Sequence, residues 1–520
     1  MTKISQAYLV NSGQSILTYP PVGVAFLAGV CERVGVEYET LDLNLEFCKY
    51  TNRDTWDQVF LHITLGQPLQ GLPTDLLSKV DDFLDHVVTR ICNYAPDCVA
   101  VSLLTHVQQY WAERFWTKLR PKYSGTIIAG GPGVGVPGVA EKTNSLTFGE
   151  DMVKKGLIDY YCLGEGDLII QEFLLGNRDL LGLNHAGVHN SWQPQLDDLD
   201  QFATPSYKKI SFDGYYPVEG KQDADDKKYL ISVTGSRGCV RRCSFCDIGH
   251  LWKKFRYRSG QNIADEILKH HVDTGAIDFW FTDSLINGSL KQCTDLMTKL
   301  IEHRKTVDSL KDLKYNGQFI IRPRSDHPEK LFRLLSESGC NRLSIGVESG
   351  SESVRNHMGK KFSNADIDWH FEMCEKYKIK NWILLITGYP TETEQDHQDT
   401  LDMLIKHQKY IVNHTILGIN LQHTMGVLPN SPVANMPELG VHFHDSEVGG
   451  TYGSYTNWLA ESNPTLTLTR RYQRFAELAE TSIKLRYNLP TEIIYFLKQH
   501  IESAQSETQM PIISESSILS

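Results

Sequence analysis

Apolar and polar positions in the first 190 residues follow the pattern of strands that alternate with helices. Short apolar runs typical of buried strands are followed by segments with a helical period of 3.6 residues, such as 22–34 and 108–119. Residues 52–90, rich in Leu and Asp, predict a largely helical insertion. This alternation indicates βαβ units and a mainly parallel sheet. The expected strands cover residues 7–10, 38–42, 98–104, 126–129 and 158–163.

The same rhythm restarts at residue 229, after a polar stretch enriched in Pro, Asp and Lys. Six βα units are too few to close an eight-stranded barrel, so we expect a partial, open barrel. Further along, the pattern predicts helices over 467–487 and 490–504, followed by a loose tail. The six expected strands cover residues 229–233, 278–281, 315–321, 342–347, 382–386 and 417–421.

These patterns predict an α/β protein in four parts. A Rossmann-like domain over 1–190 is joined by a linker over 191–228 to a partial (β/α)6 barrel over 229–430, and a mainly helical region covers 431–520. The length of 520 residues is enough for two to four domains, at about 100–200 residues each.

Charge and composition narrow the partners and the location. The chain has 52 basic and 63 acidic residues and a net charge of −11, which argues against a general nucleic-acid or anionic-membrane binder. No apolar run approaches the roughly 18 residues needed to span a bilayer. The N-terminus also lacks the apolar core of a secretory signal, so we expect a cytoplasmic protein without a membrane or nucleic-acid partner.

Three of the eleven cysteines stand close together, as C-x3-C-x2-C at Cys239, Cys243 and Cys246. Thiolates are the usual ligands of iron–sulfur clusters, and three of them leave one iron of a [4Fe–4S] cluster open for a ligand. Gly238, just before the first Cys, permits the close backbone approach of a wrapped loop. The alternative is a structural zinc site with His250 as the fourth ligand, although such sites usually pair two separate ligand hooks.

Several motifs around this triplet occur in a recognisable order. An aromatic residue, Phe245, stands directly before the last Cys. In chain order the motifs are Thr234-Gly-Ser-Arg-Gly-Cys239, Arg256-Tyr-Arg-Ser259, Gly346-Val-Glu-Ser-Gly350 and Leu385-Ile-Thr-Gly-Tyr-Pro-Thr-Glu-Thr393. Together they resemble the radical S-adenosylmethionine (SAM) superfamily. The resemblance implies that SAM binds the open iron and is cleaved reductively to a deoxyadenosyl radical. It also implies an electron donor such as flavodoxin or ferredoxin.

Within this resemblance, four residues besides Phe245 are candidates for binding SAM. Asp283 follows a strand and is a candidate acceptor for the SAM ammonium, with helix capping as its alternative. Arg322 is a candidate partner of the SAM carboxylate, or else part of a structural ion pair. Glu348 is expected near the ribose or amino acid, or is a helix N-terminal acid. Gly388 is expected in a turn near the adenine. No catalytic acid or base is assigned.

The N-terminal half carries a second set of motifs. These motifs resemble the cobalamin-binding domains that are fused to radical SAM cores. They are Pro20-Pro-Val-Gly23, Leu41-Asp-Leu-Asn44, 96–102, 130–132 and 164–167. The resemblance implies that Gly130 and Gly131 let the corrinoid edge or nucleotide tail approach the backbone, and that Ser102 and Glu165 contact it. A plain tight turn is the alternative for these residues.

The D-x-H-x-x-G motif, whose His coordinates cobalt in many cobalamin proteins, is absent from the chain. The type of domain and the binding of cobalamin are therefore separate expectations. His106 is a minor candidate for ligation, since a loop His is more often a surface or hydrogen-bonding residue. A G-x-G-x-x-G match at 133–138 carries little weight, because it follows a late strand and contains a Pro.

The leading hypothesis is a cobalamin-dependent radical SAM methyltransferase that acts on an unactivated carbon or on phosphorus. The alternative is a radical SAM oxidoreductase, cyclase or rearrangement enzyme that keeps the cobalamin-type domain as a scaffold. A methylthiotransferase and a non-enzymatic iron–sulfur electron carrier or sensor are weaker hypotheses. The expected substrate is a small molecule or a peptide. Tyr452, Tyr455 and Trp458 are expected either to close the barrel mouth or to be ordinary packing residues.

Overall fold

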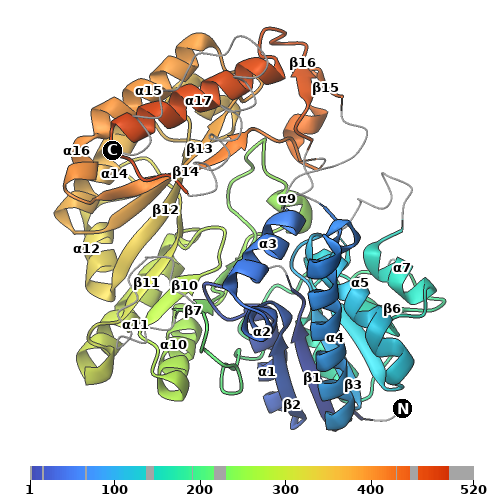
Figure 1. The fold of residues 1–520 in the computed structure, drawn as a ribbon. Helices are drawn as coiled ribbons and strands as arrows, with labels where there is room; N and C mark the ends of the chain where they lie inside the picture. Colours follow the sequence, from blue (N-terminus) through green and yellow to red (C-terminus); the bar gives the residue numbers. More distant parts are fainter. Residues whose placement is uncertain are drawn as a thin grey trace.

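A computed structural model describes residues 3–13, 17–64, 67–135, 146–189, 191–215, 230–428, 430–444 and 455–490. Two six-stranded sheets with flanking helices form the body of the protein (Figure 1). The sheet of the first half lies at the lower right of Figure 1, and the sheet of the second half lies at the left. The predicted α/β fold class is confirmed.

The N-terminal sheet has the strand order β2-β1-β3-β4-β5-β6. The first five strands in this order are parallel, and β6 runs antiparallel to β5. Five strands lie where the sequence predicts them. The sixth, β6, has only three residues and gives no sequence signal of its own. The strands are β1 (Gln6–Asn11), β2 (Glu37–Asp42), β3 (Cys98–Ser102), β4 (Thr126–Gly130), β5 (Tyr160–Cys162) and β6 (Leu183–His185).

Helices cover both faces of this sheet. On one face α1 (Val22–Val34) packs beside α8 (Gly166–Leu174). The other face is covered by α4 (Thr74–Tyr94) and α5 (Gln108–Leu119), whose apolar residues share a second core with the sheet. The predicted helical insertion forms α4 and the shorter α3 (Arg53–Thr64). Each sheet face is therefore buried, as a parallel sheet requires.

The second sheet is the open barrel, with six parallel strands in the order β14-β13-β12-β11-β10-β7. Among the described residues β14 and β7 do not pair with each other, so the barrel is partial, as predicted. Its strands are β7 (Leu230–Val233), β10 (Asp278–Phe281), β11 (Lys314–Phe319), β12 (Cys340–Glu348), β13 (Lys380–Thr387) and β14 (Ile416–Thr424). The connecting helices are α10 (Gly260–Thr274), α11 (Leu290–Thr306), α12 (Glu329–Ser338), α14 (Asn364–Lys376) and α15 (Glu394–His407).

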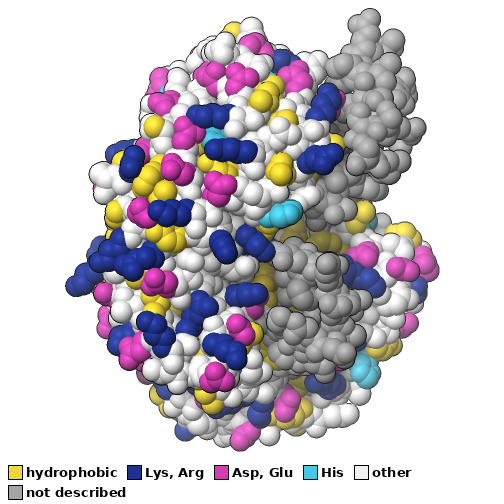
Figure 2. Space-filling view, turned by 90° about the vertical axis from the view of Figure 1, so that its left-hand side faces the viewer, with side chains coloured by type: hydrophobic (Ala, Val, Ile, Leu, Met, Phe, Trp, Pro, Cys, Tyr) yellow, Lys and Arg dark blue, Asp and Glu magenta, His cyan; other side chains and the backbone are white. Residues whose placement is uncertain are grey.

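The outer barrel helices form the face that Figure 2 shows. Lys and Arg side chains gather across the middle of this face, and apolar side chains appear only in small groups (Figure 2). A local excess of positive charge thus exists on a chain whose net charge is −11.

Residues 191–215 cross between the two sheets and are tied to both. Arg33 of α1 donates to the carbonyls of Gln201 and Phe202. The Tyr207 hydroxyl donates to the Ser232 carbonyl in β7. The predicted linker is therefore a packed strap over this range, and the rest of it, 216–228, lies outside the described residues.

The C-terminal region adds helix α17 (Leu468–Lys484), close to the predicted 467–487, and a hairpin of β15 (Val441–Phe443) and β16 (Trp458–Ala460). Tyr452, the predicted helix over 490–504 beyond its first residue, and the predicted tail lie outside the described residues. Within the described ranges, no helix is long and apolar enough to cross a membrane.

Candidate functional site

The cysteine loop starts from a small hairpin of β8 (Ser236–Arg237) and β9 (Arg256–Tyr257). Gly238 follows β8 with a φ of +88°, and a Cβ at this position would lie 2.6 Å from the Lys254 carbonyl oxygen. Only Gly accepts both the left-handed backbone and this close approach. Gly238 thus allows the tight wrapping that its position in the sequence predicts.

The three candidate ligands Cys239, Cys243 and Cys246 are partly buried in this loop. Burial raises the pKa of Cys246 to about 11, and the charges of Asp247, Cys243 and Cys239 add to the effect. In the described part of the chain, no three His, Cys, Asp or Glu side chains converge on a point where one metal ion would sit. The C-x3-C-x2-C spacing on one loop fits three corners of an iron–sulfur cluster, and it lacks the second ligand hook that zinc sites usually have.

Ser244, between two of these cysteines, is held by three distant segments. Its backbone N–H donates to the Met358 carbonyl at 3.0 Å, and its carbonyl accepts from the Val433 N–H at 2.8 Å. Its hydroxyl lies 2.7 Å from the Tyr389 hydroxyl, which in turn lies 2.7 Å from His357 Nδ1. Sequence reasoning did not select Tyr389, whose only signal is its place in the Gly-Tyr-Pro turn.

Asp283 lies at the base of the cysteine loop. It is 4% exposed, accepts from the Gly235 N–H at 2.8 Å and is hydrogen-bonded to the Ser236 hydroxyl. Burial raises the pKa of Asp283 to about 6. The N-cap of the following helix α11 is Ser289, so Asp283 does not cap that helix. Both carboxylate oxygens are occupied in holding the start of the loop.

Glu348 ends β12 in the left-handed region, with a φ of +68°. Its Oε1 lies 2.7 Å from the Lys360 ammonium, and both side chains are less than a tenth exposed. Burial opposes the charge on Lys360, but Glu348, Cys243 and Cys239 raise its pKa above the usual value. A strained, buried acid and its cation therefore stand beside the cysteine loop. Sequence reasoning found Glu348 but missed Lys360.

Arg322 and Phe245 also lie near this loop. Arg322 Nη2 donates to the carbonyls of Asn287 and Gly288, at 3.0 and 2.9 Å. Its buried Nε has no partner among the described residues, and burial together with the nearby Arg241 lowers the pKa of Arg322. The ring centroid of Phe245 lies 5.8 Å from the Lys360 ammonium. Arg322 is thus a guanidinium with spare donor capacity at the same end of the barrel.

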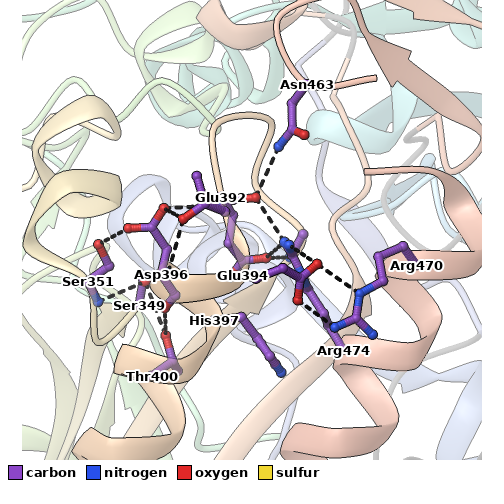
Figure 3. Close-up of polar contacts among 12 residues, drawn as sticks. Ser349, Ser351, Glu392, Glu394, Asp396, His397, Thr400, Asn463, Arg470 and Arg474 are labelled. Carbon is purple, nitrogen blue, oxygen red and sulfur yellow. Dashed lines mark hydrogen bonds and ion pairs between the residues drawn. The ribbon is translucent and has the colours of Figure 1, made fainter. Parts of the chain in front are cut away.

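The turn after β13 is braced by helix α17 (Figure 3). Gly388 has a φ of +79°, and a Cβ there would lie 2.7 Å from the Arg471 side chain. Its N–H donates to Glu392 Oε2 at 2.8 Å, and Arg474 Nη1 donates to the same oxygen at 3.0 Å. Burial raises the pKa of Glu392 to about 7, despite Arg474. Figure 3 shows Arg474 and Arg470 reaching the turn from α17 and pairing with Glu394.

A cavity of about 160 Å³ lies in the N-terminal domain, between α1 and α8 at the carboxyl ends of β3 and β4. Ser102, Gly130 and Gly131 line it. A Cβ on Gly130 would meet only the Cys162 Cβ, at 3.7 Å, and a Cβ on Gly166 would meet nothing within 4 Å. Gly130 and Gly166 thus leave a cradle that side chains would fill, in the position where open α/β sheets bind ligands, whereas a Cβ on Gly131 would collide with the Leu103 carbonyl oxygen. In the G-x-G-x-x-G match, 136–138 lie outside the described residues.

Glu165 does not line this cavity. Its two oxygens accept from Arg237 and Arg256, each at 2.8 Å, and Oε2 also accepts from the Leu196 N–H. The structure therefore places Glu165 in an ion-pair cluster between the two domains rather than at a ligand. Asp167, two residues later, lines the cavity and was not selected from the sequence.

Comparison with known families identifies the barrel. Residues 233–404 match the radical SAM superfamily. The chain carries a radical SAM domain. The predicted radical SAM domain is confirmed, and the matched residues include the Cys triplet, Asp283, Arg322, Glu348 and Gly388.

Curated relatives fall into two groups. The chain is 28% identical over 184 residues to the tRNA-2-methylthio-N(6)-dimethylallyladenosine synthase of Hydrogenobaculum sp., covering 34% of this chain and 41% of that relative. It is 23% identical over 389 residues to the cytidylyl-2-hydroxyethylphosphonate methyltransferase of Streptomyces wedmorensis, covering 68% of this chain and 65% of that relative. The chain spans about half the length of the curated relatives that it matches.

Two solved structures share the architecture over nearly the whole chain. One is the radical SAM methyltransferase TsrM from Kitasatospora setae, with tryptophan substrate and a SAM analogue bound (TM-score 0.62, 16% identity, 92% of this chain and 89% of that one). The other is the cobalamin-dependent SAM radical enzyme OxsB with aqua-cobalamin and SAM bound (TM-score 0.62, 15% identity, 96% and 71%). At these identities the likeness shows a common fold of both domains.

Proposed function

We propose that this radical SAM protein is a cobalamin-dependent methyltransferase that acts on an unactivated carbon. The observation that carries the proposal is the glycine-lined cavity at the carboxyl edge of the N-terminal sheet. The alignment with the Streptomyces methyltransferase supports it, because it is more than twice as long as the radical SAM match and so extends beyond that domain. In this proposal residues 1–190 form the cobalamin-binding domain, 191–228 the linker, 229–430 the radical core and 431–520 a C-terminal region.

In the radical core, Cys239, Cys243 and Cys246 would hold the [4Fe–4S] cluster. The cluster, when bound and reduced, supplies the electron that cleaves SAM. Arg322 has a buried Nε without a partner among the described residues, which would be available to the SAM carboxylate. The buried ion pair of Glu348 and Lys360 lies next to the cysteine loop. An electron donor such as flavodoxin or ferredoxin would supply the electron. The substrate remains a small molecule or a peptide of unassigned structure.

In the N-terminal domain, Ser102, Gly130, Gly131 and Gly166 would admit an edge or the nucleotide tail of cobalamin. When bound, cobalamin supplies a methyl carrier. The loop after β3 extends the same edge with Leu104, which is 67% exposed and offers an apolar contact. His106 follows in this loop and is partly exposed. Since D-x-H-x-x-G is absent, the proposal leaves the lower face of cobalt without a His ligand.

The second candidate is a radical SAM oxidoreductase, cyclase or rearrangement enzyme with the N-terminal domain as scaffold. The missing cobalt-binding His motif favours it. A methylthiotransferase is less favoured, because the relatives of that name that were aligned match only 34–42% of the chain. In addition, Cys31, Cys98 and Cys162 come from three different elements, α1, β3 and β5, and are buried in the apolar core of the N-terminal domain.

Product analysis separates these candidates. The protein, reconstituted with iron, sulfide and hydroxocobalamin, is incubated anaerobically with SAM and titanium(III) citrate. The methyltransferase proposal predicts S-adenosylhomocysteine in addition to 5′-deoxyadenosine, and neither product from Cys243→Ala. Production of 5′-deoxyadenosine alone, by protein that retains cobalt, would instead support the second candidate.

A further inference from the structure

The cysteine hairpin and the N-terminal domain meet through two arginines and two acids. Arg237 and Arg256 face each other in register on β8 and β9. Arg237 Nη1 and Nη2 donate to Oδ2 and Oδ1 of Asp167, each at 2.8 Å. Glu165 bridges the arginines, with its Oε1 2.8 Å from Arg237 Nη1 and its Oε2 2.8 Å from Arg256 Nη1. The four side chains balance in charge.

This ion-pair cluster is buried. The side chains of Glu165 and Arg256 are 1% and 4% exposed, and those of Asp167 and Arg237 are 11% and 14% exposed. Phe202 from the strap lies 4.7 Å from the Arg237 guanidinium, and Trp252 lies within 6 Å of both arginines. Bidentate, charge-assisted hydrogen bonds away from water are strict in both distance and direction. The cluster therefore fixes one geometry between the two domains.

The ion-pair cluster also connects the two proposed cofactor sites through a short stretch of chain. Asp167 lines the N-terminal cavity, while Arg237 is followed by Gly238 and then by Cys239. The left-handed Gly238, pinned against the Lys254 carbonyl, leaves little freedom between the arginine and the first cysteine. A displacement of Arg237 would thus be passed on to the cysteine loop.

We propose that Arg237 is a positioning residue. Through its ion pairs with Asp167 and Glu165 it holds the cysteine loop, and with it the [4Fe–4S] cluster, at a fixed place relative to the N-terminal cavity. The inference rests on the proposed function, because a fixed separation matters when both places hold cofactors that act on one SAM molecule. Displacement of reacting groups by about 1 Å is enough to slow a reaction about 100-fold. Arg237 itself touches neither cofactor in this account.

Pulsed EPR on the full chain tests this directly. A genetically encoded amino acid that carries a Gd(III) chelate, which stays paramagnetic under the reductant, replaces Lys79, an exposed residue of α4, and its distance to the reduced [4Fe–4S] cluster is measured. The parent protein should give one narrow distance distribution, and Arg237→Gln should broaden or shift it. The control is Lys254→Gln, which removes an exposed ion pair with Asp197 in the strap and should leave the distribution unchanged. A distribution in Arg237→Gln identical to the parent would overturn the proposal.

If the Arg237→Gln protein does not retain the [4Fe–4S] cluster, Asp167→Asn tests the Arg237–Asp167 ion pair from the other domain. It leaves the cysteine loop intact, so the same broadening is expected, and an unchanged distribution would overturn the proposal. Substitutions at the two partners of one ion pair have effects that do not add. The double variant Asp167→Asn with Arg237→Lys should therefore broaden the distance distribution little more than the stronger of its two single variants. The measurement needs no cobalamin, so a failure to bind cobalamin would count against the proposed function and not against this inference.

Discussion

The Tyr389 hydroxyl lies 2.7 Å from the Ser244 hydroxyl, and this contact joins the turn after β13 to the cysteine loop. Tyr389 is fully buried, and its oxygen also meets His357 Nδ1 at 2.7 Å. The loop that carries the candidate cluster ligands is therefore fixed from the opposite side of the barrel mouth, as well as by Arg237 from the N-terminal domain.

Replacing Tyr389 by Phe should loosen this loop without changing its ligands. The change leaves the Ser244 hydroxyl and the His357 nitrogen without their buried partner, which costs about 1–3 kcal/mol in the free energy of unfolding. Urea denaturation measures this loss, and iron content after desalting should fall with it.

Tyr8→Phe is the matched control, because the buried Tyr8 hydroxyl has no hydrogen-bond partner among the described residues. It should change neither unfolding nor iron content. Equal effects of the two substitutions would contradict the role assigned to the Tyr389 hydroxyl.

Replacing Lys360 by Met should leave the Glu348 carboxylate buried and unpaired. Removing one partner of a buried ion pair typically costs about 3–5 kcal/mol. The exposed neighbour Lys361 provides the control, since Lys361→Met should stay within about 0.5 kcal/mol of the parent. Denaturation curves at pH 7 measure both, and a Lys360→Met protein as stable as Lys361→Met would show that the pair does not matter.

Glu392 should give stability a specific pH dependence. Its pKa rises from 4.5 to about 7 on folding because of burial, so between these values the folded protein binds more protons than the unfolded chain. The free energy of unfolding therefore falls as pH rises through this window. Glu392→Gln removes that fall, so its stability relative to the parent should increase by about 2–3 kcal/mol between pH 5 and pH 8.

Glu394 is the control of opposite sign. Its hydrogen bonds with Arg470, and then with Arg474, lower the pKa of Glu394 to about 2, so its contribution to stability is lost only as pH falls below 4.5. The stability of Glu394→Gln relative to the parent should therefore stay constant from pH 5 to pH 8. A parallel pH course for the two variants would refute the assignment of the titration to Glu392.

Filling the N-terminal cavity should remove cobalamin and spare the iron. A side chain at Gly166 enters open space, so Gly166→Ala should fold normally and Gly166→Phe should occupy the cradle. Cobalt retained after desalting should decrease slightly with Ala and at least about tenfold with Phe, as a lost contact of about 1.4 kcal/mol or more requires. Full cobalt retention by a folded Gly166→Phe protein would place cobalamin elsewhere.

Local patterns predicted most of the fold, because long periodic segments determine it. The helices over Val22–Val34 and Gln108–Leu119 lie where their 3.6-residue period predicts them, and β10 covers the predicted Asp278–Phe281. The strand β6 was missed, since its three residues gain their pairing from β5 rather than from their own pattern. Antiparallel edge strands of this length depend on tertiary contacts.

Sequence analysis selected the candidate cluster ligands but missed the residues that hold their loop in place. The Cys triplet is compact in sequence, so its spacing alone points to a cluster. Lys360, Tyr389 and Asp167 act through partners that are 12, 145 and 70 residues away in the chain. Glu165 was placed at a ligand because its motif resembles a cofactor-binding turn, whereas the structure pairs it with Arg237 and Arg256. Sequence spacing carries no information about such long-range pairs.

Metal analysis tests the central claim most directly. The protein is reconstituted anaerobically with iron, sulfide and hydroxocobalamin, desalted, and analysed for iron and cobalt together with its visible spectrum. The account predicts about four irons and about one cobalt per chain, with iron lost and cobalt kept in Cys243→Ala. About four irons with no retained cobalt would contradict the cobalamin-dependent function, while leaving the radical SAM domain in place.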